Sequence, residues 1–203
     1  MMTYDIVNVR SNPAQWMAWQ QSVFSDWDLL NTLRKAEFRA SLRLEPFVPP
    51  EGKTGDSDNT RYIVPRGDAL DSYREHVSSV VAPKTIQANR NGMQWLGAGI
   101  DALDITGETV AIFGSGQEAD HRKALGNIVP TEDWVRMQHC MLLVPDAEEY
   151  HYWSWRAAHR QPEALIRVKP DIGFQARLLK AEKAMFDRHK EHNQANMKPA
   201  NVV

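Results

Sequence analysis

The sequence is poor in cysteine and has no long apolar run. Its 203 residues include one cysteine, Cys140, which excludes an intramolecular disulfide framework. No apolar stretch approaches the roughly 18 residues that a membrane-spanning helix needs, and the first ten residues show no signal-peptide core. We therefore expect a cytoplasmic protein that has no association with a membrane.

Neither sign of charge is in excess. The chain has 24 Lys and Arg against 26 Asp and Glu, a formal net charge of −2 at pH 7. Non-specific DNA affinity comes mostly from clustered cations that neutralise phosphates, so this balance does not by itself indicate a DNA-binding protein. The 24 basic residues still suffice for a local basic patch. Hydrophobic residues make up 42%, which at this length predicts one globular domain.

The hydrophobic pattern predicts alternating helices and strands over residues 1–192, with a disordered tail over 193–203. A capping residue before a proline, Asn12-Pro13, indicates the start of a helix, and Thr106-Gly107 indicates a turn. The expected helices lie at about 13–21, 26–41, 66–80, 131–140 and 171–192. The expected strands lie within 1–10, 84–104, 108–113, 151–155 and 164–169. Residues 45–60 are rich in Pro, Gly and Asp and predict a mobile loop.

One stretch, from Trp95 to Phe113, reads WLGAGIDALDITGETVAIF. It resembles the core of the YqaJ / lambda-exonuclease family, which has the PD-(D/E)XK nuclease fold. In that fold an Asp ends one strand and an E-x-K tripeptide lies on the next. Asp101 stands at the Asp position, but Ala111 and Phe113 stand where Glu and Lys are expected. The resemblance implies an α/β (α+β) fold with a central mixed β-sheet flanked by helices.

Further segments match the family in the same order, over roughly residues 13–188. They are Pro13–Trp16 at the first helix, Gly67–Asp71 with Asp in place of Glu, Trp134–Val144, Ala147–Trp153 and Val168–Asp171. Each segment is a weak signal alone. Their shared order and spacing predict the fold.

The resemblance also implies a metal-dependent active site, and most of that site is missing. Asp101 and Asp71 are the two carboxylates at matched positions, where the family would bind a divalent metal. Ala111 cannot bind metal, and Phe113 cannot supply the cation that offsets charge in the transition state. A glutamine of the family is replaced by Arg136. We therefore assign no catalytic residue. We expect no cofactor, or Mg²⁺ if a nuclease site still functions.

The family's terminal-phosphate pocket is altered as well. Its arginine and serine positions hold Gln20 and Trp27 in this chain. Because both the catalytic centre and the pocket that recognises DNA ends are changed, the sequence favours a pseudo-nuclease that keeps the scaffold.

Three functions remain open at the level of sequence. The first is a degenerate phage-type exonuclease that acts in recombination or repair by binding DNA or a protein partner. The second is an active Mg²⁺-dependent double-strand exonuclease that has recruited other residues, such as Glu108, Glu118, Asp120 or Lys123. The third is an inhibitor or decoy directed at a host nuclease. The resemblance implies a bacterial or phage-infected cell, with a recombination or nuclease protein as partner and a homo- or hetero-oligomer as possible assemblies.

An aromatic cluster in and just before the strand predicted at 151–155 allows two interpretations. Tyr150, Tyr152, Trp153 and Trp155 alternate with other residues, so some side chains face the core and others can stack nucleobases or contact a partner.

Overall fold

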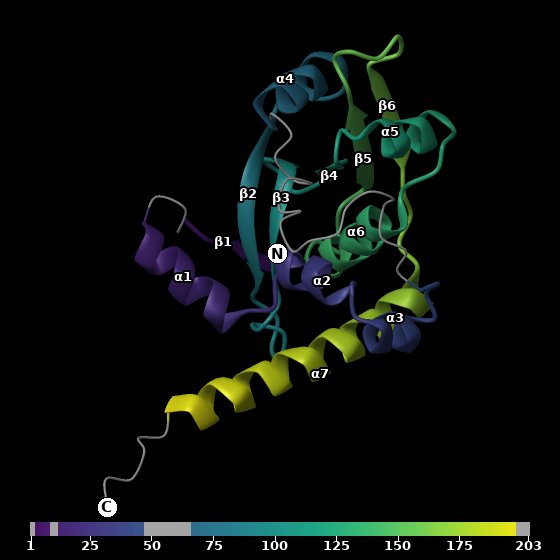
Figure 1. Cartoon of the computed structure of the whole chain (residues 1–203). Helices are drawn as coiled ribbons and strands as arrows, with labels where there is room; N and C mark the ends of the chain where they lie inside the picture. The colour runs from purple at the N-terminus through teal and green to yellow at the C-terminus, as the bar shows by residue number, and fades with distance from the viewer. Residues whose placement is uncertain (1–2, 9–11, 47–65, 198–203) are drawn as a thin grey trace, which may run out of the picture.

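A six-stranded mixed sheet forms the centre of the molecule, in a computed structural model that describes residues 3–8, 12–46 and 66–197 (Figure 1). The strand order follows the chain, and only β4 and β5 run parallel; the other neighbours are antiparallel. The strands are β1 (Tyr4–Ile6), β2 (Val81–Ala88), β3 (Gly97–Asp104), β4 (Thr109–Phe113), β5 (Glu149–Trp155) and β6 (Glu163–Arg167). This confirms the predicted fold class.

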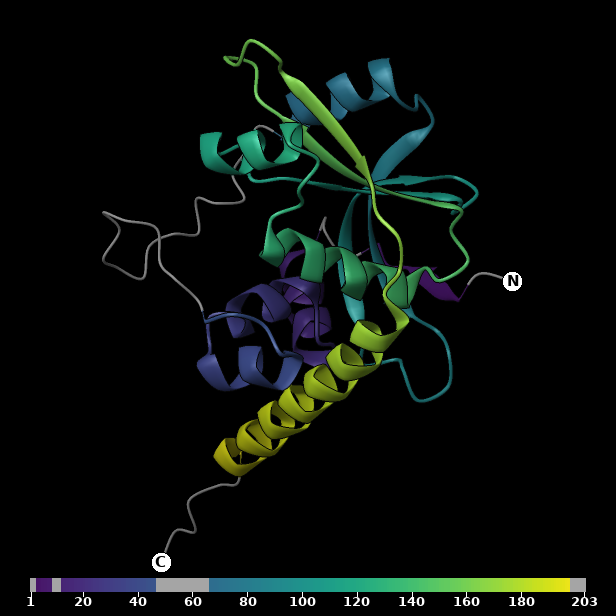
Figure 2. The same ribbon diagram turned by 90° about the vertical axis from the view of Figure 1, so that its right-hand side faces the viewer.

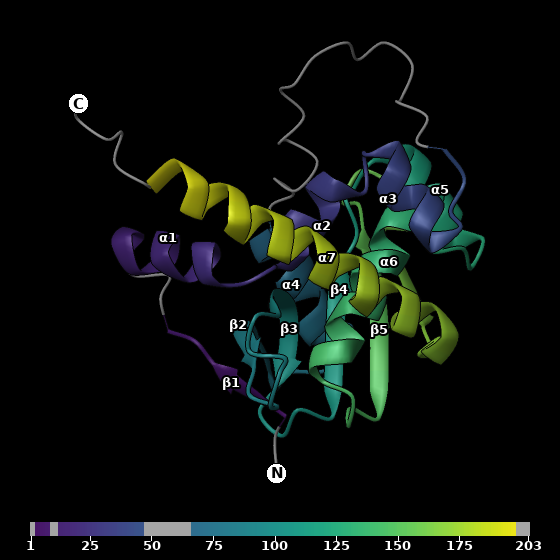
Figure 3. The same cartoon turned by 90° about the horizontal axis from the view of Figure 1, so that it is seen from below.

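Helices cover both faces of the sheet. They are α1 (Pro13–Ser22), α2 (Asp26–Thr32), α3 (Ala36–Leu42), α4 (Arg66–His76), α5 (Glu118–Leu125), α6 (Thr131–Leu143) and α7 (Ile172–Met197). A large apolar core joins α2, α3, α6 and α7 to one face, and a smaller cluster joins α4 to the other. Figure 2 shows α4 on the side of the sheet away from α6 and α7, and Figure 3 shows α7 running past α1, α2 and α6.

A bulge distorts the sheet beside the motif. The register of β2 and β3 shifts between Ala82 and Lys84, so that Pro83 faces both Asp101 and Ala102. Proline has no backbone N–H to donate, and a bulge is one of the few places where a strand tolerates it. Bulges commonly re-aim a side chain next to a functional site. Here the two β3 residues at the bulge are Asp101, the position of the nuclease motif, and Ala102.

Most predicted elements are confirmed, with shifts at their ends. The edge strand β1 and the helix after Asn12 are present, and the Asn12 side chain accepts hydrogen bonds from the first turn. Gly107 has a φ of 80°, as the predicted turn requires. The stretch predicted as one helix over 26–41 is two helices, because the backbone is extended at Lys35.

Other predictions need correction. Residues 84–104 form two strands rather than one segment, α4 ends at His76 rather than near 80, and α5 was not predicted. The last helix continues to Met197, so residues 193–197 extend it; residues 198–203 lie outside the described residues, as does the predicted loop 45–60 from residue 47 onward. In the described part of the chain, no helix combines the length and the apolar character that crossing a membrane requires.

Candidate functional site

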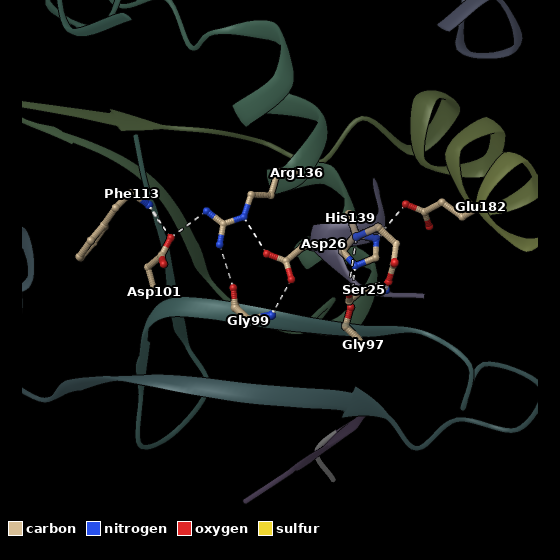
Figure 4. A network of polar contacts seen from close by, with 10 residues as sticks. Ser25, Asp26, Gly97, Gly99, Asp101, Phe113, Arg136, His139 and Glu182 are labelled. Atoms are coloured by element: carbon tan, nitrogen blue, oxygen red, sulfur yellow. Dashed lines mark hydrogen bonds and ion pairs between the residues drawn. The ribbon is translucent and has the colours of Figure 1, made fainter. Parts of the chain in front are cut away.

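Arg136 lies at the centre of the candidate site. This α6 residue is 2% exposed, and its guanidinium donates to three groups (Figure 4). Nε donates to Asp26 Oδ2 at 2.9 Å and Nη1 to Asp101 Oδ2 at 2.9 Å. Nη2 donates to the Gly99 carbonyl at 3.0 Å. A single buried cation thus joins α2, β3 and α6.

The surroundings keep this guanidinium charged. Burial by itself would lower the pKa of Arg136, but the adjacent Asp101 and Asp26 hold that pKa well above its ordinary value. Burial would likewise raise the pKa of Asp26, yet Arg136 and the Gly99 N–H, which donates to Asp26 Oδ1 at 2.8 Å, keep it below its ordinary value. The contacts are therefore ion pairs inside the protein, where screening by water is weak.

Asp101 lies within β3 rather than at the end of the strand, where the motif would place it, and its side chain is used within the fold. Its Oδ2 accepts from Arg136 and also from the Phe113 N–H at 2.9 Å. The side chain is 2% exposed. The same carboxylate oxygen therefore accepts from a guanidinium and from a backbone amide.

The next strand carries no polar side chain at the other two motif positions. Ala111 and Phe113 of β4 are buried in an apolar cluster with Tyr73 and Trp153. The Tyr73 ring lies 5.6 Å from that of Phe113 and 5.5 Å from that of Trp153, between ring centroids. Aromatic side chains therefore fill the side of the sheet toward which these two positions point.

A buried tyrosine–histidine pair adjoins this cluster. Tyr73 Oη lies 2.7 Å from Nδ1 of His151, the residue of β5 that pairs with Ala111. Burial raises the pKa of Tyr73 and lowers the pKa of His151, so burial favours the neutral form of both groups in this hydrogen bond. His151 Nε2 lies 2.9 Å from Glu149 Oε2. The pair stabilises the contact between α4 and β5 and has no ionised nucleophile.

Asp71, the second predicted metal ligand, lies elsewhere. Its side chain on α4 is 76% exposed, and one of its oxygens lies 3.6 Å from Arg74 Nη1. Asp101, by contrast, is buried against α6, so the structure does not bring the two carboxylates together. Over residues 3–8, 12–46 and 66–197, no cluster of three His, Cys, Asp or Glu side chains could hold a metal ion. The residues present do not fit the divalent ion that the resemblance implies.

The alternative ligands considered from the sequence are also dispersed. Glu118 pairs with Arg122 and Arg156 at 2.8 Å each. Asp120 accepts from the Ser115 hydroxyl at 2.8 Å and lies 3.5 Å from Lys123 Nζ. These contacts hold α5 to its surroundings. Glu108 is exposed in the turn before β4.

A pocket of about 390 Å³ opens beside Arg136. The side chains that matter for its chemistry are Trp16, Trp19, Gln20, Asp26, Trp27 and Arg136. Gln20 and Trp27 were the positions matched to the terminal-phosphate pocket, and the structure does bring them together. The aromatic cluster of β5, in contrast, belongs mainly to the core, with Tyr150, Tyr152 and Trp153 buried.

A second buried ion pair lies on the same helix as Arg136. His139 Nδ1 lies 2.8 Å from Glu182 Oε1 of α7, and His139 Nε2 lies 2.9 Å from the Gly97 carbonyl (Figure 4). Burial would lower the pKa of His139, but Glu182 and the Gly97 carbonyl raise it above its ordinary value. The protonated imidazole donates to both groups and ties α6 and α7 to β3.

The sequence analysis did not identify Asp26, although it contained one sign that Arg136 needs buried carboxylate partners. Arg136 lies between the apolar residues Val135 and Met137, in a predicted helix that leads into the apolar run 140–144, so burial of the arginine could be expected. A buried guanidinium requires carboxylates. The sequence could show that requirement but not which carboxylates meet it, because Asp26 lies 110 residues away.

Solved structures share this fold. No protein-family model and no curated protein matches the chain. A crystal structure of LHK-Exo in complex with dAMP matches with a TM-score of 0.64 and 13% sequence identity, over 90% of this chain and 95% of that chain. A second, described as an alkaline exonuclease from Laribacter hongkongensis, matches with a TM-score of 0.61 and 12% identity, over 94% of this chain and 100% of that chain. The fold is therefore exonuclease-like.

Proposed function

We propose that this protein is an exonuclease-fold protein that has lost metal-dependent cleavage and acts in DNA recombination or repair by binding DNA. One observation carries the proposal: the Arg136 guanidinium forms a buried ion pair with the carboxylate of Asp101. The exonuclease-like fold, shared with an enzyme crystallised with dAMP, supports DNA as the class of ligand.

Cleavage by this fold would require groups that the chain lacks. A divalent ion needs several hard oxygen ligands to position and ionise a water molecule. Ala111 offers no ligand, and Phe113 offers no cation for the developing charge. A metal ion at Asp101 would also have to displace Arg136, and a buried guanidinium without its partner costs several kcal/mol. Binding to DNA requires none of these steps.

The test is nucleotide release from linear, 5′-phosphorylated duplex DNA in Mg²⁺ or Mn²⁺. The wild type is compared with Asp101→Asn, which keeps the side-chain volume, and with Asp101→Ala. We expect no release above background from any of the three. Release by the wild type that both variants lose would overturn the proposal, provided that circular dichroism shows the variants to be folded.

The same assay and a binding measurement address the other two functions. Release that persists in Asp101→Asn and disappears in Glu118→Gln would support an active exonuclease with relocated residues. A fluorescence-anisotropy titration with the same duplex then tests DNA binding. We expect an affinity that falls steeply with salt concentration, because phosphate contacts release counterions. No binding at low salt would direct the search to a protein partner, including a nuclease complex that this chain joins or inhibits.

A further inference from the structure

Three tryptophans dominate the pocket beside Arg136. Trp16 and Trp19 come from α1 and Trp27 from the start of α2, and Asp26 and Arg136 line the same pocket. A volume of about 390 Å³ is within the usual range of ligand pockets, about 300 to 1,000 Å³. Trp27 is 38% exposed, so a ligand can reach its ring from solvent.

The charge of this pocket does not suit an anion. Arg136 is the one cation among the described residues that line it. All three of its guanidinium nitrogens already donate to protein oxygens, and two carboxylates balance its charge. A phosphate entering the pocket would meet the Asp26 carboxylate and would have to break an ion pair to gain a cation. The other polar side chains that line the pocket, Gln20 and Ser25, are neutral.

The same pocket suits a flat, neutral ring. Trp16 and Trp19 lie 5.2 Å apart between ring centroids, with 30° between their planes, so no third ring fits between them. The Trp19 ring is also fixed, because its Nε1 donates to Gln87 Oε1 at 3.0 Å. A ligand in the pocket would therefore stack on the outer face of one ring of this pair or against Trp27, which lines the same pocket. The Gln20 amide can both donate to and accept from the polar edge of such a ring.

We propose that the three-tryptophan pocket binds a single unpaired nucleobase at the end of a DNA strand, by stacking on indole. This inference rests on the proposed function, since it takes DNA as the ligand. Stacking of a base on an aromatic side chain tolerates any sequence, because every base presents a π face. The pocket would therefore recognise an unpaired end rather than a particular base or a terminal phosphate.

The experiment compares three duplexes by anisotropy. One is blunt, one has a single-nucleotide overhang, and one has an abasic nucleotide in that overhang; each overhang is made at the 5′ end and at the 3′ end. We expect an overhang with a base, at one of the ends, to bind about fivefold or more tightly than its abasic counterpart. Trp27→Ala should abolish that ratio, and Trp27→Phe should retain part of it. Met17→Ala is the matched control, because Met17 is 59% exposed on α1 and does not line the pocket.

The outcomes separate this inference from the proposed function. Equal binding of base and abasic overhangs at both ends, with duplex binding intact, overturns the inference alone. If no duplex binds, the proposed function fails, and a titration with adenosine decides about the pocket. Quenching of tryptophan fluorescence by adenosine that Trp27→Ala loses upholds the pocket as a base site. Quenching by inorganic phosphate or by tetramethylammonium, without quenching by adenosine, overturns it in favour of an ion site.

Discussion

Arg136 brings a full charge into the interior, and its two carboxylate partners make that position tolerable. Asp26 and Asp101 come from segments 110 and 35 residues away in the sequence. A buried ion pair is weak support for stability when it is intact, but removal of one member leaves a buried charge uncompensated. Arg136 therefore has a structural role, and another cation at Asp101 would have to compete with it.

The first prediction concerns this network. Arg136→Gln should lower the free energy of unfolding by about 3–5 kcal/mol, because Asp26 and Asp101 then lie buried without a cation. The double variant Asp101→Asn/Arg136→Gln should lose less than the sum of the two single changes. Urea unfolding of the four proteins measures both quantities. Additive losses would show that Arg136 and Asp101 are not coupled.

The second prediction concerns pH and His139. Because the pKa of His139 is raised on folding, its contribution to stability is full below the unfolded value and is lost as pH rises through the folded pKa. The difference in unfolding free energy between the wild type and His139→Gln should therefore be largest below a pH of about 6.5 and shrink above it. Urea unfolding over a pH series gives this difference.

His151 also contributes to the pH dependence of each protein in this series. The pKa of His151 is lowered, so His151 favours unfolding as pH falls, with the opposite sign. His151 is present in both proteins, and its effect cancels in the difference. Glu182→Gln is the matched control, because it removes the partner that holds the proton on His139. A difference that stays constant from acid to alkaline pH would show that folding leaves the pKa of His139 unchanged, and a difference that shifts in favour of His139→Gln as pH falls would show that the folded protein holds His139 neutral.

At the scale of elements, α1 packs closely against the sheet at Gly97, beside the hydrogen bond from Trp19 to Gln87. A Cβ atom on Gly97 of β3 would lie 2.7 Å from the Trp19 ring, closer than such atoms approach. Gly97→Ala should therefore displace Trp19 and lower the unfolding free energy by about 1–3 kcal/mol. Gly67→Ala is the control, since open space surrounds that α4 position and alanine favours helix by about 1 kcal/mol. Equal stability of Gly97→Ala and wild type in urea would refute this close packing.

Elements were predictable where one periodicity persisted along the sequence. The strand β4 and the helix α6 have regular apolar spacing, and both were predicted close to their observed bounds. The helix α5 was missed because its buried positions are Asp120, His121 and Ala124, two of them polar. Those side chains are buried by hydrogen bonds to distant residues, such as the bond between His121 and Ser154. Apolar periodicity does not show such partners.

From the sequence, the candidate site was predictable only as a set of departures from the family's motif. The motif located Asp101, Ala111 and Phe113, and it marked Arg136 as unusual. It did not show that Arg136 reaches Asp101, or that Asp71 turns to solvent. Both depend on how α6 and α4 pack on opposite faces of the sheet. That packing is a property of the assembled core, and a local motif does not contain it.

The stability of the whole molecule reports whether it binds a metal, independently of any choice of DNA substrate. An ion that binds the folded state at a hundredfold excess over its Kd stabilises that state by about 2.7 kcal/mol. Since Arg136 occupies Asp101 and Asp71 lies apart, we expect the thermal midpoint to be the same in EDTA and in Mg²⁺ or Mn²⁺. A rise in Tm with Mg²⁺ that Asp101→Asn abolishes would mean that Asp101 exchanges the guanidinium for the ion. Such a result would overturn the proposal that the metal site is lost, even if no cleavage of a substrate had been observed.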